Sequence, residues 1–213
     1  MSLYLKDISI RSRAGLSLFA PLSLKIPSGK VFTVVGPSGI GKSTLLDAIG
    51  GHLKNGFHLT GSVVLNGRNL TNLPPESRRI GVMFQDEMLF PHLSVGDNLA
   101  FGLPATMRGK EIRRAAVDSA LDQSGLSKLY DRDPATLSGG QRSRAALMRT
   151  ILAEPHALLL DEPFSKLDNT LRNEISCFVL AFTKSNAIPT LMVTHKSDDA
   201  AATGGTMLEL KLN

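Results

Sequence analysis

This chain has little cysteine and no long apolar run, and each of these absences excludes some classes of protein. The 213 residues include one cysteine, Cys177, which excludes a disulfide framework and a cysteine metal cluster and favours a reducing compartment. Cys177 lies in an apolar helical pattern, and we expect a buried small side chain rather than a nucleophile. The sequence has no apolar run of the ~18 residues that a membrane helix needs. Asp7 falls where the apolar core of a signal peptide would lie.

The chain is long and apolar enough to form a folded domain. Its residues are 42% hydrophobic, unlike a disordered or low-complexity chain, and its length favours one domain over residues 1–213. The formal net charge is +5. A basic balance suits an anionic ligand, an acidic partner or a membrane surface, and ordinary solubility accounts for it equally well.

Apolar runs alternate with helical patterns along the chain. Strands are predicted at residues 3–10, 22–26, 31–35, 63–65, 80–84, 157–160, 190–194 and 207–210. The run at 31–35 is continuous, as expected of a strand buried on both faces. A helix predicted at residues 111–124 places on one face Ile112, Ala116, Val117, Ala120 and Leu121. The alternation predicts an α/β fold with a largely parallel sheet and a mostly helical insertion.

A glycine-rich segment between a predicted strand and a predicted helix matches the phosphate-binding loop (P-loop) pattern G-x-x-x-x-G-K-S. Backbone N–H groups of such a loop point at phosphates, Lys42 adds a positive charge for the β- and γ-phosphates, and Ser43 offers a hydroxyl to Mg²⁺. The predicted nucleotide-binding residues are Gly36, Pro37, Ser38, Gly39, Ile40, Gly41, Lys42, Ser43 and Thr44.

Two adjacent acids follow the buried strand at 157–160. Asp161 is predicted to hold Mg²⁺ through water, and Glu162 to orient or polarise the attacking water. Adjacent acids are common on surface loops. Together with a P-loop in the same chain, however, they indicate nucleotide hydrolysis.

The segment Leu137 to Gln141 reads Leu-Ser-Gly-Gly-Gln and introduces a helical pattern. Ser138 is predicted to cap that helix, and the glycines allow the backbone to approach an anion closely. Considered by itself, the segment also fits a plain capped helix.

In combination these motifs resemble the ATP-binding-cassette (ABC) ATPases, in the same order and over essentially the whole chain. The resemblance implies a P-loop NTPase fold with a mostly parallel core sheet, an N-terminal antiparallel β subdomain and a helical subdomain at about residues 86–136. It implies ATP and Mg²⁺ as ligands. It also implies a homodimer in which the nucleotide bound by one copy contacts a segment of the other copy, called the signature. The signature is formed by Ser138, Gly139, Gly140 and Gln141.

The resemblance assigns further residues. Gln85 is similar to the glutamine that reaches Mg²⁺ and the attacking water from a loop that touches the membrane subunit (the Q-loop). Residues 165–168 resemble the D-loop, which communicates across the dimer and includes Asp168. His195 is similar to the switch histidine that contacts the γ-phosphate. The implied catalytic residues are therefore Glu162, His195 and Gln85, and the implied metal-binding residues are Ser43, Gln85 and Asp161.

The chain departs from the family in three places. The aromatic residue that usually stacks on adenine is not evident, so Arg11, Arg13 or Phe19 is expected to replace it, and we expect GTP to compete well with ATP. Lys166 stands where the D-loop more usually has a small residue. Because the chain ends soon after His195, we expect no C-terminal regulatory domain of the kind that many uptake ATPases carry.

Residues 89–103 are similar to the start of the helical subdomain in bacterial uptake ATPases for sugars, polyamines, thiamine, iron and oxyanions. They put apolar side chains where a cytoplasmic helix of a membrane subunit could dock, and some of them must be ordinary core. We therefore expect an importer ATPase peripheral to the cytoplasmic face of the inner membrane. Its expected partners are permease subunits and, indirectly, a solute-binding protein, without nucleic acid. The alternatives are an exporter or lipid-extraction ATPase, a soluble ABC ATPase and a cassette that does not hydrolyse ATP.

Overall fold

The computed structural model describes residues 2–204 and 206–211, and the chain divides into two compact units. The first unit contains the residues up to Val82, His156–Glu162 and the residues from Ser176 onward. The second unit contains Met83–Pro155 and Pro163–Ile175. The predicted α/β class, with an antiparallel sheet built from the N-terminal strands, is confirmed.

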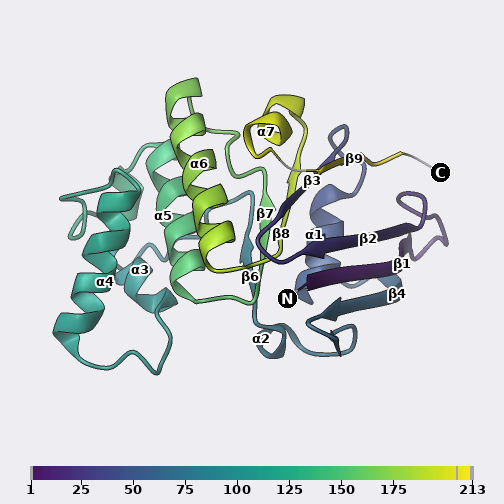
Figure 1. The fold of residues 1–213 in the computed structure, drawn as a ribbon, viewed down its shortest axis with the longest axis horizontal. Coiled ribbons are helices and arrows are strands. Elements are labelled where there is room, and N and C mark those ends of the chain that lie inside the picture. Colours follow the sequence, from purple (N-terminus) through teal and green to yellow (C-terminus); the bar gives the residue numbers. More distant parts are fainter. Residues whose placement is uncertain (1, 205, 212–213) are drawn as a thin grey trace. The chain divides into compact units, whose positions relative to one another are not determined.

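The antiparallel sheet of the first unit has the strand order β2-β1-β4-β5 (Figure 1). Its strands are β1 (Ser2–Ser12), β2 (Leu22–Pro27), β4 (Phe57–Leu65) and β5 (Arg68–Asn69). The pairing of β1 with β4 shifts register between Lys6 and Ser9. Gly61 has φ +93° there, and a methyl group on it would come within 2.4 Å of the carbonyl oxygen of Asp7. Glycine is therefore required at this bulge.

The second sheet of this unit has the order β6-β7-β8-β3-β9. The strands are β3 (Val31–Val35), β6 (Ile80–Met83), β7 (Ala157–Asp161), β8 (Thr190–Thr194) and β9 (Thr206–Glu209). The registers of β3 with β8 and β9, and of β7 with β8, are parallel. Every residue of β7 and β8 is buried, as their continuous apolar sequences predict.

Helix α1 (Lys42–Gly50) shares one hydrophobic core with both sheets. Leu45, Leu46 and Ile49 are buried in that core. The end of α1 is fixed by the buried Arg78 of α2 (Pro75–Arg78), whose Nη1 donates to the carbonyl oxygens of Ala48 at 3.0 Å and Ile49 at 2.7 Å. These bonds satisfy carbonyls that a helix end leaves without partners. Helix α7 (Ser197–Ala202) contacts β3 and β8.

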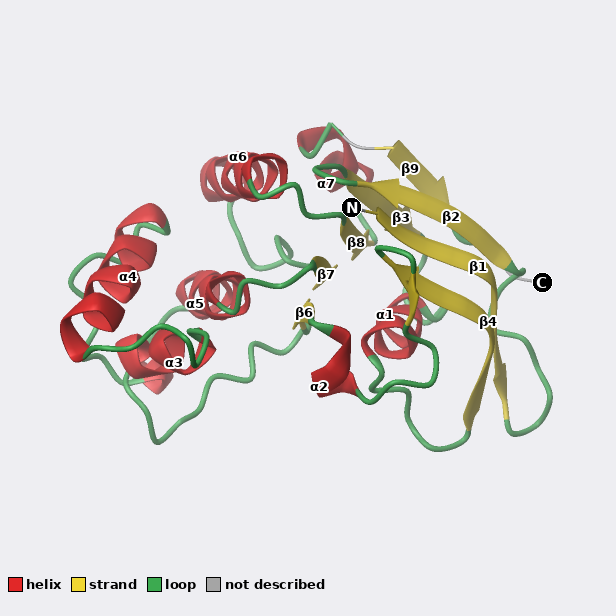
Figure 2. Ribbon diagram, turned by 60° about the horizontal axis from the view of Figure 1, so that its bottom comes forward, coloured by secondary structure: helices red, strands yellow, loops and turns green. Residues whose placement is uncertain are grey.

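The second unit is helical, and Figure 2 shows its helices in red. It contains α3 (Val95–Gly102), α4 (Lys110–Gln123), the 3-10 turn η1 (Pro134–Thr136) and α5 (Gly139–Leu152). Helices α3, α4 and α5 contact one another. The predicted apolar face of α4 is confirmed for Val117, Ala120 and Leu121, which are buried, but Ile112 is 61% exposed. Ile112 lies in the first turn of α4, ahead of the buried part of its face.

Helix α6 (Asn169–Ser185) is capped by Asp168, whose Oδ1 accepts a hydrogen bond from the backbone N–H of Leu171 at 3.0 Å. The prediction that Cys177 is buried was wrong, since its side chain is exposed. The buried positions of this part of α6 are Ile175, Ser176, Val179 and Thr183. Cys177 is rotated by about 100° from Ser176 and so points away from that face. Among the described residues, no helix combines the length and apolarity of a membrane span.

Candidate functional site

The P-loop connects β3 to α1 in the first unit. Gly39 and Gly41 have φ values of +83° and +101°, a backbone conformation that side chains with a Cβ rarely adopt. A methyl group on Gly41 would also lie 3.1 Å from Cδ1 of Leu18. Both glycines are therefore needed for the loop to turn into the helix.

Lys42 is the first residue of α1, and its side chain bends back into the loop. Its ammonium donates to the carbonyl oxygens of Gly36 at 2.7 Å and Pro37 at 2.9 Å. The residue is 6% exposed. A full positive charge is thus held inside a loop whose helix N-terminus adds partial positive charge, which is the field that a polyphosphate requires.

Asp161 ends β7 beside this loop and accepts a hydrogen bond from Ser43. Burial raises the pKa of Asp161, the negative charge of Glu162 raises it further, and the bond from Ser43 acts in the opposite direction. Its Oδ1 atom is buried without a hydrogen-bond partner. A buried carboxylate oxygen without a partner next to a serine hydroxyl fits the oxygen ligands of a Mg²⁺ ion.

Glu162 and His195 are bonded to each other in the first unit. The Nδ1 of His195 lies 3.0 Å from Oε1 of Glu162. A carboxylate can only accept, so against an ionised Glu162 this ring nitrogen carries the proton. Glu162 has φ +47°, and its N–H donates to the carbonyl oxygen of Val193 at 2.9 Å. The chain therefore turns sharply after β7 and brings the carboxylate to the residue that follows β8.

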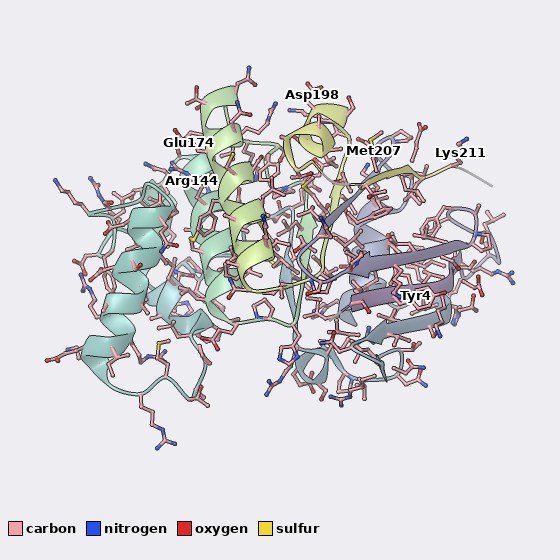
Figure 3. All side chains as sticks on the ribbon, viewed as in Figure 1. Tyr4, Arg144, Glu174, Asp198, Met207 and Lys211 are labelled. Atoms are coloured by element: carbon pink, nitrogen blue, oxygen red, sulfur yellow. The ribbon has the colours of Figure 1, made fainter. Side chains whose placement is uncertain are left out.

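A cavity of about 350 Å³ opens where His195 meets the P-loop. Its lining includes Gly36 and Pro37 of the loop, and Met207 and Glu209 of β9. Met207, labelled in Figure 3, is 53% exposed. The histidine and the P-loop therefore face a common space in which a ligand can lie.

The residues proposed to contact the base differ in exposure. Phe19 is 0% exposed, so the expectation that it could stack on adenine was wrong. Its ring packs in the core, with Cδ1 at 3.5 Å from a methyl group placed on Gly41. Arg11 near the end of β1 and Arg13 in the loop that follows are exposed, and Leu16 of that loop is 71% exposed. The arginines thus remain the candidates for contact with a base.

In the second unit, Ser138 caps α5 as predicted. Its Oγ accepts from the N–H of Gln141 at 3.2 Å, and Oε1 of Gln141 accepts from the N–H of Ser138 at 2.9 Å. This reciprocal capping box gives a structural reason for glutamine at position 141, the last residue of the Leu-Ser-Gly-Gly-Gln segment. Ser138 is exposed, and Gly139 and Gly140 are partly exposed.

The D-loop packs on these glycines from within the same chain. A methyl group on Gly139 would lie 3.6 Å from Cδ of Lys166, and one on Gly140 would lie 3.1 Å from Cδ2 of Leu167. The sequence suggested close approach of an anion to the glycines. The structure adds a second reason for Gly140, because a methyl group there would crowd Leu167 of the D-loop, whereas one on Gly139 would make ordinary contact with Lys166.

Several residues that hold this region were missed by the sequence analysis. The buried Arg144 of α5 donates to the carbonyl oxygens of Ser124 at 2.7 Å and Gly140 at 3.3 Å, and Figure 3 shows it on the same side of the unit as Glu174. Burial lowers the pKa of Arg144, and Glu174 acts to raise it. A charged residue within the helical pattern that follows Gln141 was the available signal.

Gln85 belongs to the second unit, together with the signature and Asp168, and its side chain is exposed. The segment after it is tied to α5, because Arg149 donates to the carbonyl oxygens of Met88 at 2.9 Å and Glu87 at 3.3 Å. The predicted site residues therefore fall in two groups. Lys42, Ser43, Asp161, Glu162 and His195 lie in the first unit, and the others outside the P-loop lie in the second.

An apolar patch lies just after Gln85 in the second unit. It is formed by Met88, Phe90 and Phe101, of which Met88 is 62% and Phe101 is 67% exposed. The rings of Phe90 and Phe101 meet edge to face with centroids 4.7 Å apart. The guanidinium of Arg149 lies 5.2 Å from the centroid of Phe90. Exposed aromatic residues with a basic neighbour are typical of protein-binding surfaces.

The chain is similar to known proteins over nearly its full length. Residues 19–165 match the family model described as ABC transporter. The chain is 46% identical over 200 residues to the uncharacterized ABC transporter ATP-binding protein YnjD of Escherichia coli, covering 94% of this chain and 91% of that protein. It is 39% identical to the thiamine import ATP-binding protein ThiQ of Aliivibrio fischeri, covering 84% of this chain and 75% of that protein.

Other relatives are longer than this chain. The sulfate/thiosulfate import ATP-binding protein CysA of Mycobacterium tuberculosis is 43% identical over 82% of this chain, which spans 49% of that protein. Among solved structures, a dimeric bacterial ABC transporter cassette superposes with a TM-score of 0.84 at 28% identity. The superposition covers 98% of this chain and 94% of the cassette chain. A second structure of that cassette, in a post-hydrolysis state with ADP and Pi, matches equally well.

Proposed function

Because the chain belongs to the ABC transporter family of ATPases, we propose that it is the ATP-hydrolysing subunit of a bacterial importer. The proposal takes residues 1–213 as one ATPase domain with a helical subdomain at about residues 86–136. Two copies bind two ATP molecules between them, and closure of this homodimer is coupled to transport across the inner membrane. The dimeric cassette with which the chain superposes supports such a pair.

The proposed roles in the first unit follow from its contacts. The backbone of Gly36 to Thr44 and the charge of Lys42 bind the phosphates. Glu162 orients the attacking water, and its bond to His195 holds the histidine where it contacts the γ-phosphate. Ser43, Asp161 and Gln85 would hold Mg²⁺, which would supply positive charge to the phosphate oxygens. Most of the catalysis is then positioning and electrostatic stabilisation.

The second unit serves the other copy in this proposal. Ser138 to Gln141 meets the nucleotide bound by the P-loop of the partner, and Asp168 communicates across the dimer. The exposed hydroxyl of Ser138 and the start of α5 are suited to an anion, because a helix N-terminus carries partial positive charge. An isolated monomer is then a poor ATPase, since its own signature cannot serve its own ATP.

Import rather than export is supported by the relatives and by the apolar patch. Relatives at about 40% identity are described as importing sulfate, spermidine or thiamine. The patch of Met88, Phe90 and Phe101 is suited to a cytoplasmic helix of a permease subunit, which keeps the chain at the cytoplasmic face of the inner membrane. A solute-binding protein would then choose the cargo. Co-purification of a permease from native membranes tests this part of the proposal.

One observation carries the hydrolytic function: Glu162 is bonded to His195 next to a buried Asp161 whose Oδ1 has no partner. The Glu162→Gln variant keeps the size of the side chain and removes its charge. We expect at least about a hundredfold loss of turnover, while an ATP-bound dimer accumulates on gel filtration. Glu76→Gln, at an exposed glutamate of α2, is the matched control. A strictly monomeric Glu162→Gln variant at saturating ATP would contradict the shared site.

A further inference from the structure

Glu87 accepts hydrogen bonds from two segments that lie far from it in the sequence, the D-loop and α5. Its Oε1 accepts from Nζ of Lys166 in the D-loop at 2.6 Å and from Oγ of Ser143 in α5 at 3.1 Å. Nε of Arg142 lies 4.0 Å from its other oxygen. All four residues belong to the second unit. One carboxylate therefore joins the segment after Gln85, the helix of the signature and the D-loop.

The surroundings of this contact set its strength. The side chain of Glu87 is 11% exposed and that of Lys166 is 40% exposed. Partial burial acts to raise the pKa of Glu87, but hydrogen bonds from Lys166 and Ser143 outweigh it and keep the pKa below its usual value. Glu87 is thus ionised at neutral pH. A charge-assisted bond of this length to a largely buried carboxylate is stronger than a typical surface ion pair.

Lys166 also covers the signature. Its Cδ packs over Gly139, and the following Leu167 packs over Gly140. Because Arg149 already fixes the backbone of residues 87–88 to α5, Glu87 is an anchored acceptor. The bond to Glu87 therefore holds Lys166 in place. It also holds the part of the D-loop that lies on Gly139 and Gly140.

We propose that Lys166 and Glu87 are positioning residues whose ion pair fixes the D-loop and signature loop relative to the segment that follows Gln85. This inference rests on the proposed function, because it concerns the surface that one copy presents to the nucleotide of the other. The Lys166 that departs from the usual small D-loop residue is thereby explained by an acidic partner 79 residues earlier in the chain.

The test separates charge from packing. Lys166→Met keeps an unbranched stem over Gly139 but loses the charge, and Glu87→Gln keeps the size of its partner. We expect each to lower the kcat of ATP hydrolysis by about threefold to tenfold, with KM for ATP changed less than about twofold, because the P-loop is untouched. Lys166→Arg is expected to retain most of the activity. The reversed pair Lys166→Glu with Glu87→Lys is expected to recover at least about half of what either reversal alone loses.

Two exposed residues provide matched controls, Lys184→Met in α6 and Glu111→Lys in α4, which should leave kcat unchanged. Wild-type kcat in Lys166→Met, or a reversed pair no better than its single variants, would overturn the inference. If wild-type protein itself lacks ATPase activity, the proposed function fails instead.

Hydrogen exchange of the backbone amides tests the positioning role of Lys166 without a measurement of ATP hydrolysis, so it separates failure of this inference from failure of the proposed function. Lys166→Met should speed exchange in peptides covering residues 137–141 and 163–169 of the nucleotide-free protein, and Lys184→Met should not. Unchanged exchange in both peptides would overturn the inference whatever the ATPase result.

Discussion

The two groups of site residues are built in opposite ways. In the first unit Lys42 is buried inside its loop and Asp161 is buried against Ser43, while the partly buried Glu162 is bonded to the exposed His195. In the second unit the signature is exposed or partly exposed, and the buried Arg144 holds it through a bond to the carbonyl oxygen of Gly140. The first group is organised to enclose a ligand, whereas the second is organised to present a surface.

The largest effect should come from breaking the enclosed group. Lys42→Ala removes the buried ammonium, and we expect at least about a hundredfold loss of kcat/KM for ATP together with most of the nucleotide affinity. Binding of a fluorescent ATP analogue and phosphate release measure the two losses. Lys184→Ala is the control. Wild-type hydrolysis by the Lys42→Ala protein would show that the P-loop assignment is wrong.

A smaller effect should come from the presented group. Ser138→Ala removes the cap of α5 and should cost about 1 kcal/mol of stability against urea, because the N–H of Gln141 loses its acceptor. Turnover should fall while the affinity of the nucleotide-free monomer for ATP stays unchanged. Ser138→Thr keeps a capping hydroxyl and should restore stability. A loss of monomer affinity equal to that of Lys42→Ala would remove the distinction between the two groups.

The smallest effect should concern the base. With Phe19 buried, the exposed Arg11 and Arg13 are the remaining candidates for contact with the base. We expect ATP and GTP to bind within about tenfold of each other, since discrimination requires buried hydrogen-bonding groups. Competition binding measures the ratio. A strong preference for ATP would contradict base recognition by the arginines.

The sequence predicted the parts of the fold that depend on local patterns. The buried strands predicted at 31–35, 157–160 and 190–194, and the cap at Ser138, follow from residues within a few positions of one another. The last strand was placed one residue too late, at 207–210 rather than Thr206–Glu209. Such shifts at element ends are expected, because chain ends of strands have few neighbours to define them.

Contacts between distant segments could not be predicted in the same way. Lys166 was recognised as unusual, but its partner Glu87 follows only from the folded chain. Cys177 and Phe19 illustrate the same limit. An apolar helical stretch does not say which residue faces the core, and an aromatic residue near the P-loop can pack inward instead of facing a ligand.

The exposed position of Cys177 also makes the protein convenient for spectroscopy. Because the sequence has one cysteine and its thiol is accessible on α6, a maleimide dye or spin label would attach at a single place without prior mutagenesis. A pair of identical copies would then carry one probe each. The distance between the two probes could report directly on assembly and separation during a catalytic cycle.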